Sequence, residues 1–145
     1  MKTEKELSVT EQMDLLYLYS GIAWIIGGIF MFFDGILFTI IEIVAMLTLV
    51  ISHIFVMRAK KENQDELSEK NYHKARSHAL TYMHVIYAVI IIALQLIGLF
   101  NRDASLTIDV KELLIPLFFI SLGIEYIMIG FLFRKYERDG DECIY

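Results

Sequence analysis

Five polar side chains stand inside long apolar stretches of this sequence. Glu42 and His53 share one stretch, His84 and Gln95 share the next, and Glu125 lies in a later one. Each pair is spaced by eleven residues, which is close to three helical turns, so both members point to the same side of a helix. A charged side chain at membrane depth costs about 2.5–3.5 kcal/mol on insertion scales, so each residue needs a partner or a function.

These residue types are compatible with three kinds of site. In an antiparallel hairpin the two polar stripes would face each other, pairing His53 with His84 and Glu42 with Gln95. The pairs would then be interhelical hydrogen bonds that fix register, which is the interpretation we favour because membrane bundles use such bonds often. Alternatively, Glu42 and Glu125 would carry protons or cations along a path. In the third interpretation His53 and His84 would hold a haem, or a divalent metal together with Glu125.

Four apolar runs must position these side chains, and each is long enough to cross a bilayer. The second run has 23 residues, or about 34 Å of helix, against a hydrocarbon core of about 30 Å. The sequence therefore predicts an all-α integral membrane protein, an antiparallel bundle of four transmembrane helices. The predicted spans are residues 15–33, 35–57, 79–100 and 113–133.

Composition agrees with a membrane protein and narrows the partners. The chain has 145 residues, enough for one domain, of which 57% are hydrophobic, and its mean hydropathy is +0.54. Its net charge is −5, with 18 acidic residues against 13 basic ones, which argues against a nucleic-acid partner. Cys143 is the only cysteine, so no disulfide within the chain is possible.

The basic residues predict the orientation of the spans. Eleven of the 13 Lys and Arg residues lie in the two terminal segments and the segment between the second and third spans, and two lie in the loop before the fourth span. The positive-inside rule places the richer side, with both termini, in the cytoplasm, and the protein in the cell membrane. The polar segments are residues 1–14, a helical connector at 58–78, an outer loop at 101–112 and a tail at 134–145.

Local signals mark where helices begin and turn. Ser8 with Glu11 has the form of a capping box, and the pair Asp34-Gly35 suits a tight turn. Ser68 is the expected N-cap of a long third helix, and Pro116 predicts a kink or an irregular start to the fourth span. Because the connector is rich in helix formers, we expect the second and third helices to extend into the cytoplasm and to turn near residues 63–65.

One face of the first span carries small residues instead of large side chains. Gly21, Gly27 and Gly28 let another helix approach closely, which is how helices associate in lipid. No nucleophile elbow, HExxH motif or phosphate-binding loop is present. We therefore predict a non-enzymatic membrane protein, without a required cofactor, that acts by assembling with itself or with a membrane partner as an accessory or regulatory subunit. The alternatives are the small transporter or channel using Glu42 and Glu125, and the haem or metal protein using His53 and His84.

Overall fold

The computed structural model describes residues 6–59, 65–100 and 113–141, without the side chains of residues 91, 94–100, 140 and 141. The predicted outer loop at 101–112 and the side chain of Gln95 lie outside this part of the chain. The predicted all-helical class is confirmed. The helices are α1 (Val9–Met13), which continues through a π-helical turn (Asp14–Tyr19) into α2 (Ser20–Phe30), then α3 (Ile36–Arg58), α4 (Glu66–Phe100) and α5 (Ile115–Asp141).

Three of these helices, within the described residues, are long and apolar enough to cross a membrane. They are Val9–Phe30, Ile36–Arg58 and Ile115–Asp139, and they correspond to the first, second and fourth predicted spans. The third predicted span, residues 79–100, forms the second half of α4. Its membrane crossing stays a prediction, because several of its side chains fall outside the described set.

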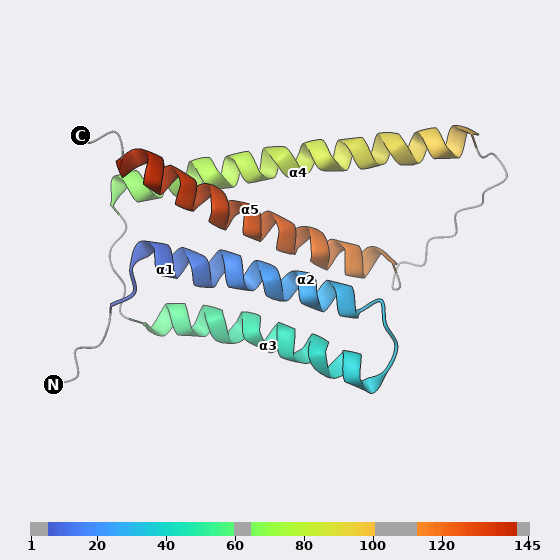
Figure 1. Ribbon diagram of the computed structural model, residues 1–145, viewed down its shortest axis with the longest axis horizontal. Coiled ribbons are helices and arrows are strands. Elements are labelled where there is room, and N and C mark those ends of the chain that lie inside the picture. Colours follow the sequence, from blue (N-terminus) through green and yellow to red (C-terminus); the bar gives the residue numbers. More distant parts are fainter. Residues whose placement is uncertain (1–5, 60–64, 101–112, 142–145) are drawn as a thin grey trace.

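The helices lie in a row rather than in a square. The α1–α2 helix packs against α3 on one side and α5 on the other, and α4 packs against α5. Figure 1 shows α3 and α4 at opposite edges of this row. The start of α1, the end of α3, the start of α4 and the end of α5 all lie at one end of the molecule.

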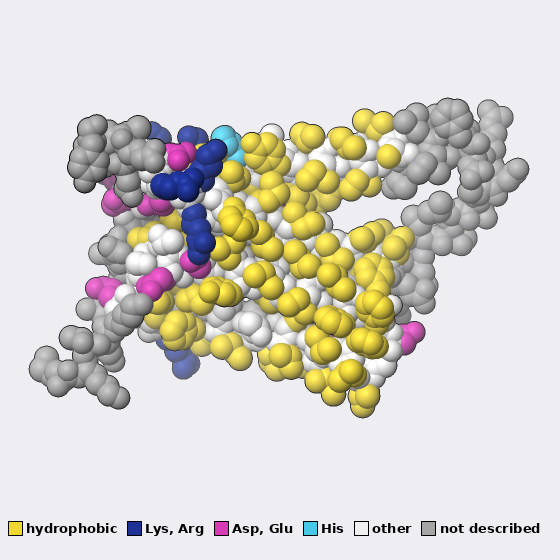
Figure 2. Space-filling model, in the orientation of Figure 1, with side chains coloured by type: hydrophobic (Ala, Val, Ile, Leu, Met, Phe, Trp, Pro, Cys, Tyr) yellow, Lys and Arg dark blue, Asp and Glu magenta, His cyan; other side chains and the backbone are white. Residues whose placement is uncertain are grey.

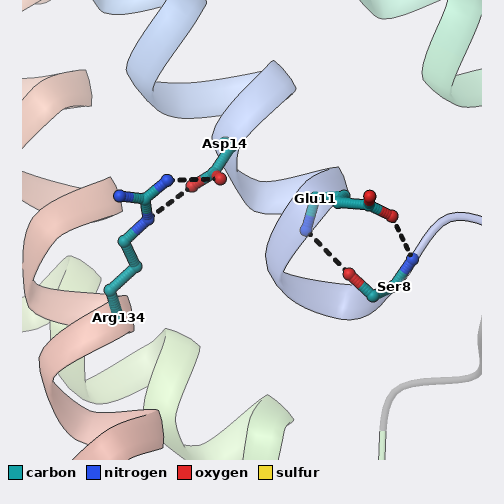
Figure 3. Close-up of polar contacts among 4 residues, drawn as sticks. All are labelled: Ser8, Glu11, Asp14 and Arg134. Carbon is teal, nitrogen blue, oxygen red and sulfur yellow. Dashed lines mark hydrogen bonds and ion pairs between the residues drawn. The ribbon is translucent and has the colours of Figure 1, made fainter.

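The start of the first helix and the first turn follow the sequence signals. Ser8 and Glu11 form the predicted capping box: the Ser8 hydroxyl oxygen accepts from the Glu11 amide at 3.2 Å, and the Glu11 carboxylate accepts from the Ser8 amide at 3.0 Å (Figure 3). The helix ends at Phe30, three residues before the predicted end of the span. Gly35 then precedes α3 with φ +132°, a conformation that is essentially restricted to glycine.

The second helix does not extend past the apolar run, contrary to the prediction. It ends at Arg58, and Ala59 has an extended backbone. The third helix does extend past its apolar run, as predicted, since α4 begins at Glu66, and α5 also runs on to Asp141. The charged ends of α4 and α5 pack against each other and against α1, burying Ala75 and Phe133 completely. Since α3 lies at the opposite edge of the row from α4, a longer α3 would not reach the contact between α4 and α5 that stabilises their charged ends.

Asp65, rather than the predicted Ser68, caps the start of α4. The Ser68 amide donates to the Asp65 carboxylate at 2.7 Å, and this bond holds the pKa of Asp65 below its usual range. Ser68 itself is buried, and its hydroxyl donates to Glu137 on α5. At the start of the fourth span, residues 113–114 form a π-type turn and Pro116 lies in the first turn of α5, in agreement with the predicted irregular start.

Candidate functional site

A very close helix contact joins α2 and α5 at Gly21 and Gly123. A Cβ atom added to Gly21 would lie 2.7 Å from the Gly123 carbonyl oxygen, and one added to Gly123 would lie 2.6 Å from the Gly21 carbonyl oxygen. The two backbones therefore touch directly, as small residues permit in membrane helices. Trp24 packs beside this contact, with its ring centroid 4.9 Å from that of Phe119.

The contact continues in both directions with a seven-residue spacing. A Cβ atom on Gly28 would lie 2.8 Å from the Pro116 carbonyl oxygen, and one on Gly130 would lie 2.8 Å from Cγ of Leu18. Thus two of the three glycines named from the sequence, Gly21 and Gly28, meet α5. The third, Gly27, faces α3, where its added Cβ would lie 2.5 Å from Cε at the flexible end of the Met46 side chain and 4.0 Å from Cβ of Ala45.

Gly123 and Gly130 were missed in the sequence analysis. The available signal was a spacing of seven residues that the two helices share. On α5 it relates Pro116, Gly123 and Gly130, and on α2 it relates Gly21 and Gly28.

A polar and aromatic cluster ties the π-helical turn after α1 to α4 and α5 at the charged end of the molecule. Buried Asn71 donates to Glu137 at 3.1 Å, the hydroxyl groups of Tyr17 and Tyr72 lie 2.7 Å apart, and the Tyr136 hydroxyl lies 2.5 Å from Nδ1 of His78. The Lys74 ammonium group lies 4.4 Å from the centre of the Tyr136 ring. These contacts join segments more than 50 residues apart and hold the start of α4 on α5.

An ion pair closes this cluster on the side of the first helix. Nε of Arg134 donates to Oδ1 of Asp14 at 2.7 Å, and Nη2 donates to Oδ2 at 2.5 Å. Such a bidentate pair fixes the plane of the guanidinium group. Both residues stand at the boundary between a polar segment and an apolar run, and this mirrored placement was the signal that sequence reasoning overlooked.

On α3 the residue that meets α2 is Ser52 and not its neighbour His53. The buried side chains of α3 recur at spacings of three and four residues, and the Ser52 hydroxyl lies 3.3 Å from that of Ser20. His53 is exposed, and its Nδ1 lies 3.0 Å from the carbonyl oxygen of Leu49 in its own helix. Glu42 is half-buried at the end of α3 away from the charged cluster.

The remaining two candidates, His84 and Glu125, are carried by α4 and α5, which separate toward one end of the molecule and leave an opening between them (Figure 2). On α4 the buried positions recur from Ser68 to Met83, after which each described side chain, beginning with His84, is exposed. On α5 Glu125 is half-buried and lies one turn before the buried Ile129. Figure 2 shows the far half of α4 standing apart from the other helices.

The structure does not bring the two predicted polar stripes together. His53 on α3 and His84 on α4 lie at opposite edges of the row, with the α1–α2 helix and α5 between them. Glu42 and Glu125 are likewise carried by helices that α2 separates. Across the described residues, no group of three or more His, Cys, Asp or Glu side chains has the arrangement of a metal site.

Comparison with family models, curated proteins and solved structures finds no match to this chain. The chemistry of its own residues must therefore carry the functional argument. The far half of α4 stands apart from the other helices (Figure 2) and exposes apolar side chains. It begins with the exposed His84, and the neighbouring helix α5 carries the half-buried Glu125.

Proposed function

We propose that this chain is a non-enzymatic, multi-pass protein of the cell membrane that acts by assembling with a second copy of itself. Four antiparallel spans, with both termini in the cytoplasm, account for the three apolar helices and for the charge distribution. The single observation that carries the proposal is the unpartnered half of α4 beside α5. An accessory or regulatory subunit is the class of protein that this architecture fits.

Lipid alone is a poor cover for the far half of α4 and the part of α5 beside it, because each helix carries an ionisable side chain there, His84 and Glu125. The contacts of Asn71 with Glu137 and of His78 with Tyr136 set the register between α4 and α5. Counting residues along the two antiparallel helices from these contacts places Glu125 and His84 within about one helical turn of each other along the helix axes. Within the described residues Glu125 has no hydrogen bond or ion pair. A carboxyl group at this depth is stabilised when a polar partner reaches it.

A second copy supplies that partner by symmetry. In a two-fold dimer the α4 helix of each copy enters the opening of the other, so His84 of each copy meets Glu125 of the other. The exposed apolar side chains of α4 then pack against α5. These side chains include Val85, Ile86, Val89 and Ile90. The contact thus uses two complementary polar pairs and one apolar face, all contributed by the same chain.

Fluorescence energy transfer between dye-labelled copies of the chain in lipid vesicles measures this assembly. The chain is labelled at Cys143, its only cysteine, with donor or acceptor dye, and the protein-to-lipid ratio is varied. Interhelical hydrogen bonds contribute about 0.6 kcal/mol each, so removing both pairs weakens the dimer about eightfold. We expect this eightfold weakening of the dimer in the double variant that carries Glu125→Gln and His84→Ala. The matched controls Glu42→Gln and His53→Ala change the same residue types on α3 and leave the dimer intact.

Two results would overturn the proposal. One is transfer that stays at the level expected for randomly distributed monomers at each protein-to-lipid ratio. The other is a dimer that the α3 substitutions weaken as much as the α4 and α5 substitutions do.

A further inference from the structure

A basic groove lies on one face of α5, at the border between the apolar surface and the charged end. It is lined by Phe131, Arg134, Lys135 and Arg138, whose spacing of three, one and three residues places them on one side of a helix. Figure 2 shows Lys and Arg atoms stacked at this border, beside a continuous apolar surface. The groove thus joins cationic groups to an aromatic ring at the level where a span leaves the membrane.

The cationic groups of the groove are only partly neutralised. Asp14 binds Nε and Nη2 of Arg134, while the third guanidinium nitrogen points away from the carboxylate in Figure 3. Nε of Arg138 lies 4.0 Å from Oδ1 of Asp139, in a largely exposed pair. Lys135 has no ion pair with any residue that the structure describes. The groove therefore keeps one full positive charge and several N–H donors for a ligand.

We propose that this groove binds the phosphate group of an anionic phospholipid. Arg donors held in a fixed plane suit phosphate oxygens, and a Lys beside them adds a mobile point charge. Phe131 is 60% exposed and continues the groove into the apolar surface of α5, where the acyl chains of the lipid lie. A free phosphate ion would use the cations and leave this apolar side unfilled. Basic residues at such a border attract anionic headgroups.

Native mass spectrometry of the full chain, purified in a neutral detergent, counts the bound lipid molecules directly. The probes are phosphatidylglycerol, phosphatidylcholine with the same acyl chains, and inorganic phosphate. The test variant carries Lys135→Gln and Arg138→Gln. The control carries Arg58→Gln and Lys70→Gln, which remove the same charge from exposed positions on α3 and α4.

We expect one tightly held phosphatidylglycerol molecule per chain, which phosphatidylcholine does not replace. Each Lys or Arg near an anionic surface contributes about fivefold to binding, so the test variant loses about 30-fold in affinity and the control does not. Equal losses in the two variants, or equal binding of both lipids, would overturn the proposal. Displacement of the lipid by inorganic phosphate at equal concentration would instead assign the groove to free phosphate and contradict the lipid assignment.

A variant that fails to fold does not obscure the result. Circular dichroism reports the helix content of each variant, and the single substitution Lys135→Gln tests the same charge at a residue with no ion pair among the described side chains. The expected loss for that variant is about fivefold, and unchanged binding in it would contradict the site.

Discussion

Replacing Gly123 with alanine tests how closely α2 and α5 approach. The added Cβ would lie 2.6 Å from the carbonyl oxygen of Gly21 and 2.9 Å from the amide nitrogen of Ile25. Both are backbone atoms of α2, so no side-chain rotation relieves the overlap. The shorter distance is about 0.8 Å below the 3.4 Å at which ordinary van der Waals contact begins, so the helices must separate by roughly that amount.

The expected cost follows from two opposing effects. Forcing an extra methyl group into a well-packed contact costs about 1–3 kcal/mol, whereas alanine is favoured over glycine within a helix by up to about 1 kcal/mol. Gly123→Ala should therefore lower the free energy of unfolding by about 1–2 kcal/mol. The matched control is Gly27→Ala, whose Cβ would meet the mobile end of Met46 at 2.5 Å and the Ala45 side chain at 4.0 Å. That control should be neutral, or more stable by up to about 1 kcal/mol.

Trp24 provides a reporter for this experiment. It is the only tryptophan in the chain, and it packs against Phe119 across the contact between α2 and α5. Unfolding is followed by its fluorescence in mixtures of dodecyl maltoside and sodium dodecyl sulfate, together with circular dichroism. Equal stability of Gly123→Ala and Gly27→Ala would refute the direct backbone contact.

Two further substitutions test the local structure. Gly35→Ala should lower the free energy of unfolding by about 1–3 kcal/mol, because φ at this position is +132° and other residues rarely adopt it; the same detergent titration measures this, and a stability equal to the native protein would contradict the turn. Ser8→Ala should cost about 1 kcal/mol through loss of the capping box, whereas Thr10→Ala, at an exposed position of the same helix, should cost less. If these two α1 variants melt at the same temperature, the capping box does not stabilise the helix.

The sequence predicted the helices well because their signals are local. Apolar length, the capping box at Ser8 and the glycine at position 35 each depend on residues close in the chain. The helix ends that differ from the prediction do so because of contacts between segments that are distant in the sequence. Burial of Ala75 and Phe133 at the charged end stabilises the last turns of α5, and no spacing within α5 alone indicates this.

The arrangement of the helices was harder to predict for a physical reason. In lipid the hydrophobic effect gives an apolar side chain no preference for another helix over acyl chains, so hydrophobic periodicity does not identify neighbours. The eleven-residue spacing gave a common side for Glu42 and His53 but not the helix opposite, and Ser52 became the residue at the contact with α2. The close contact of Gly21 with Gly123 needed the small residues of two helices to be compared.

Cross-linking between copies tests the proposed assembly most directly. Two differently tagged chains, both carrying Cys143→Ser, are expressed together; one carries His84→Cys and the other Glu125→Cys. In a two-fold dimer one polar pair is then replaced by two thiols while the other pair stays intact. Mild oxidation in the membrane should join the two tags, whereas the exposed α3 position in Leu47→Cys, placed in either chain, should not. Absence of the mixed product, or a cross-link only within one chain that carries both substitutions, would contradict the account.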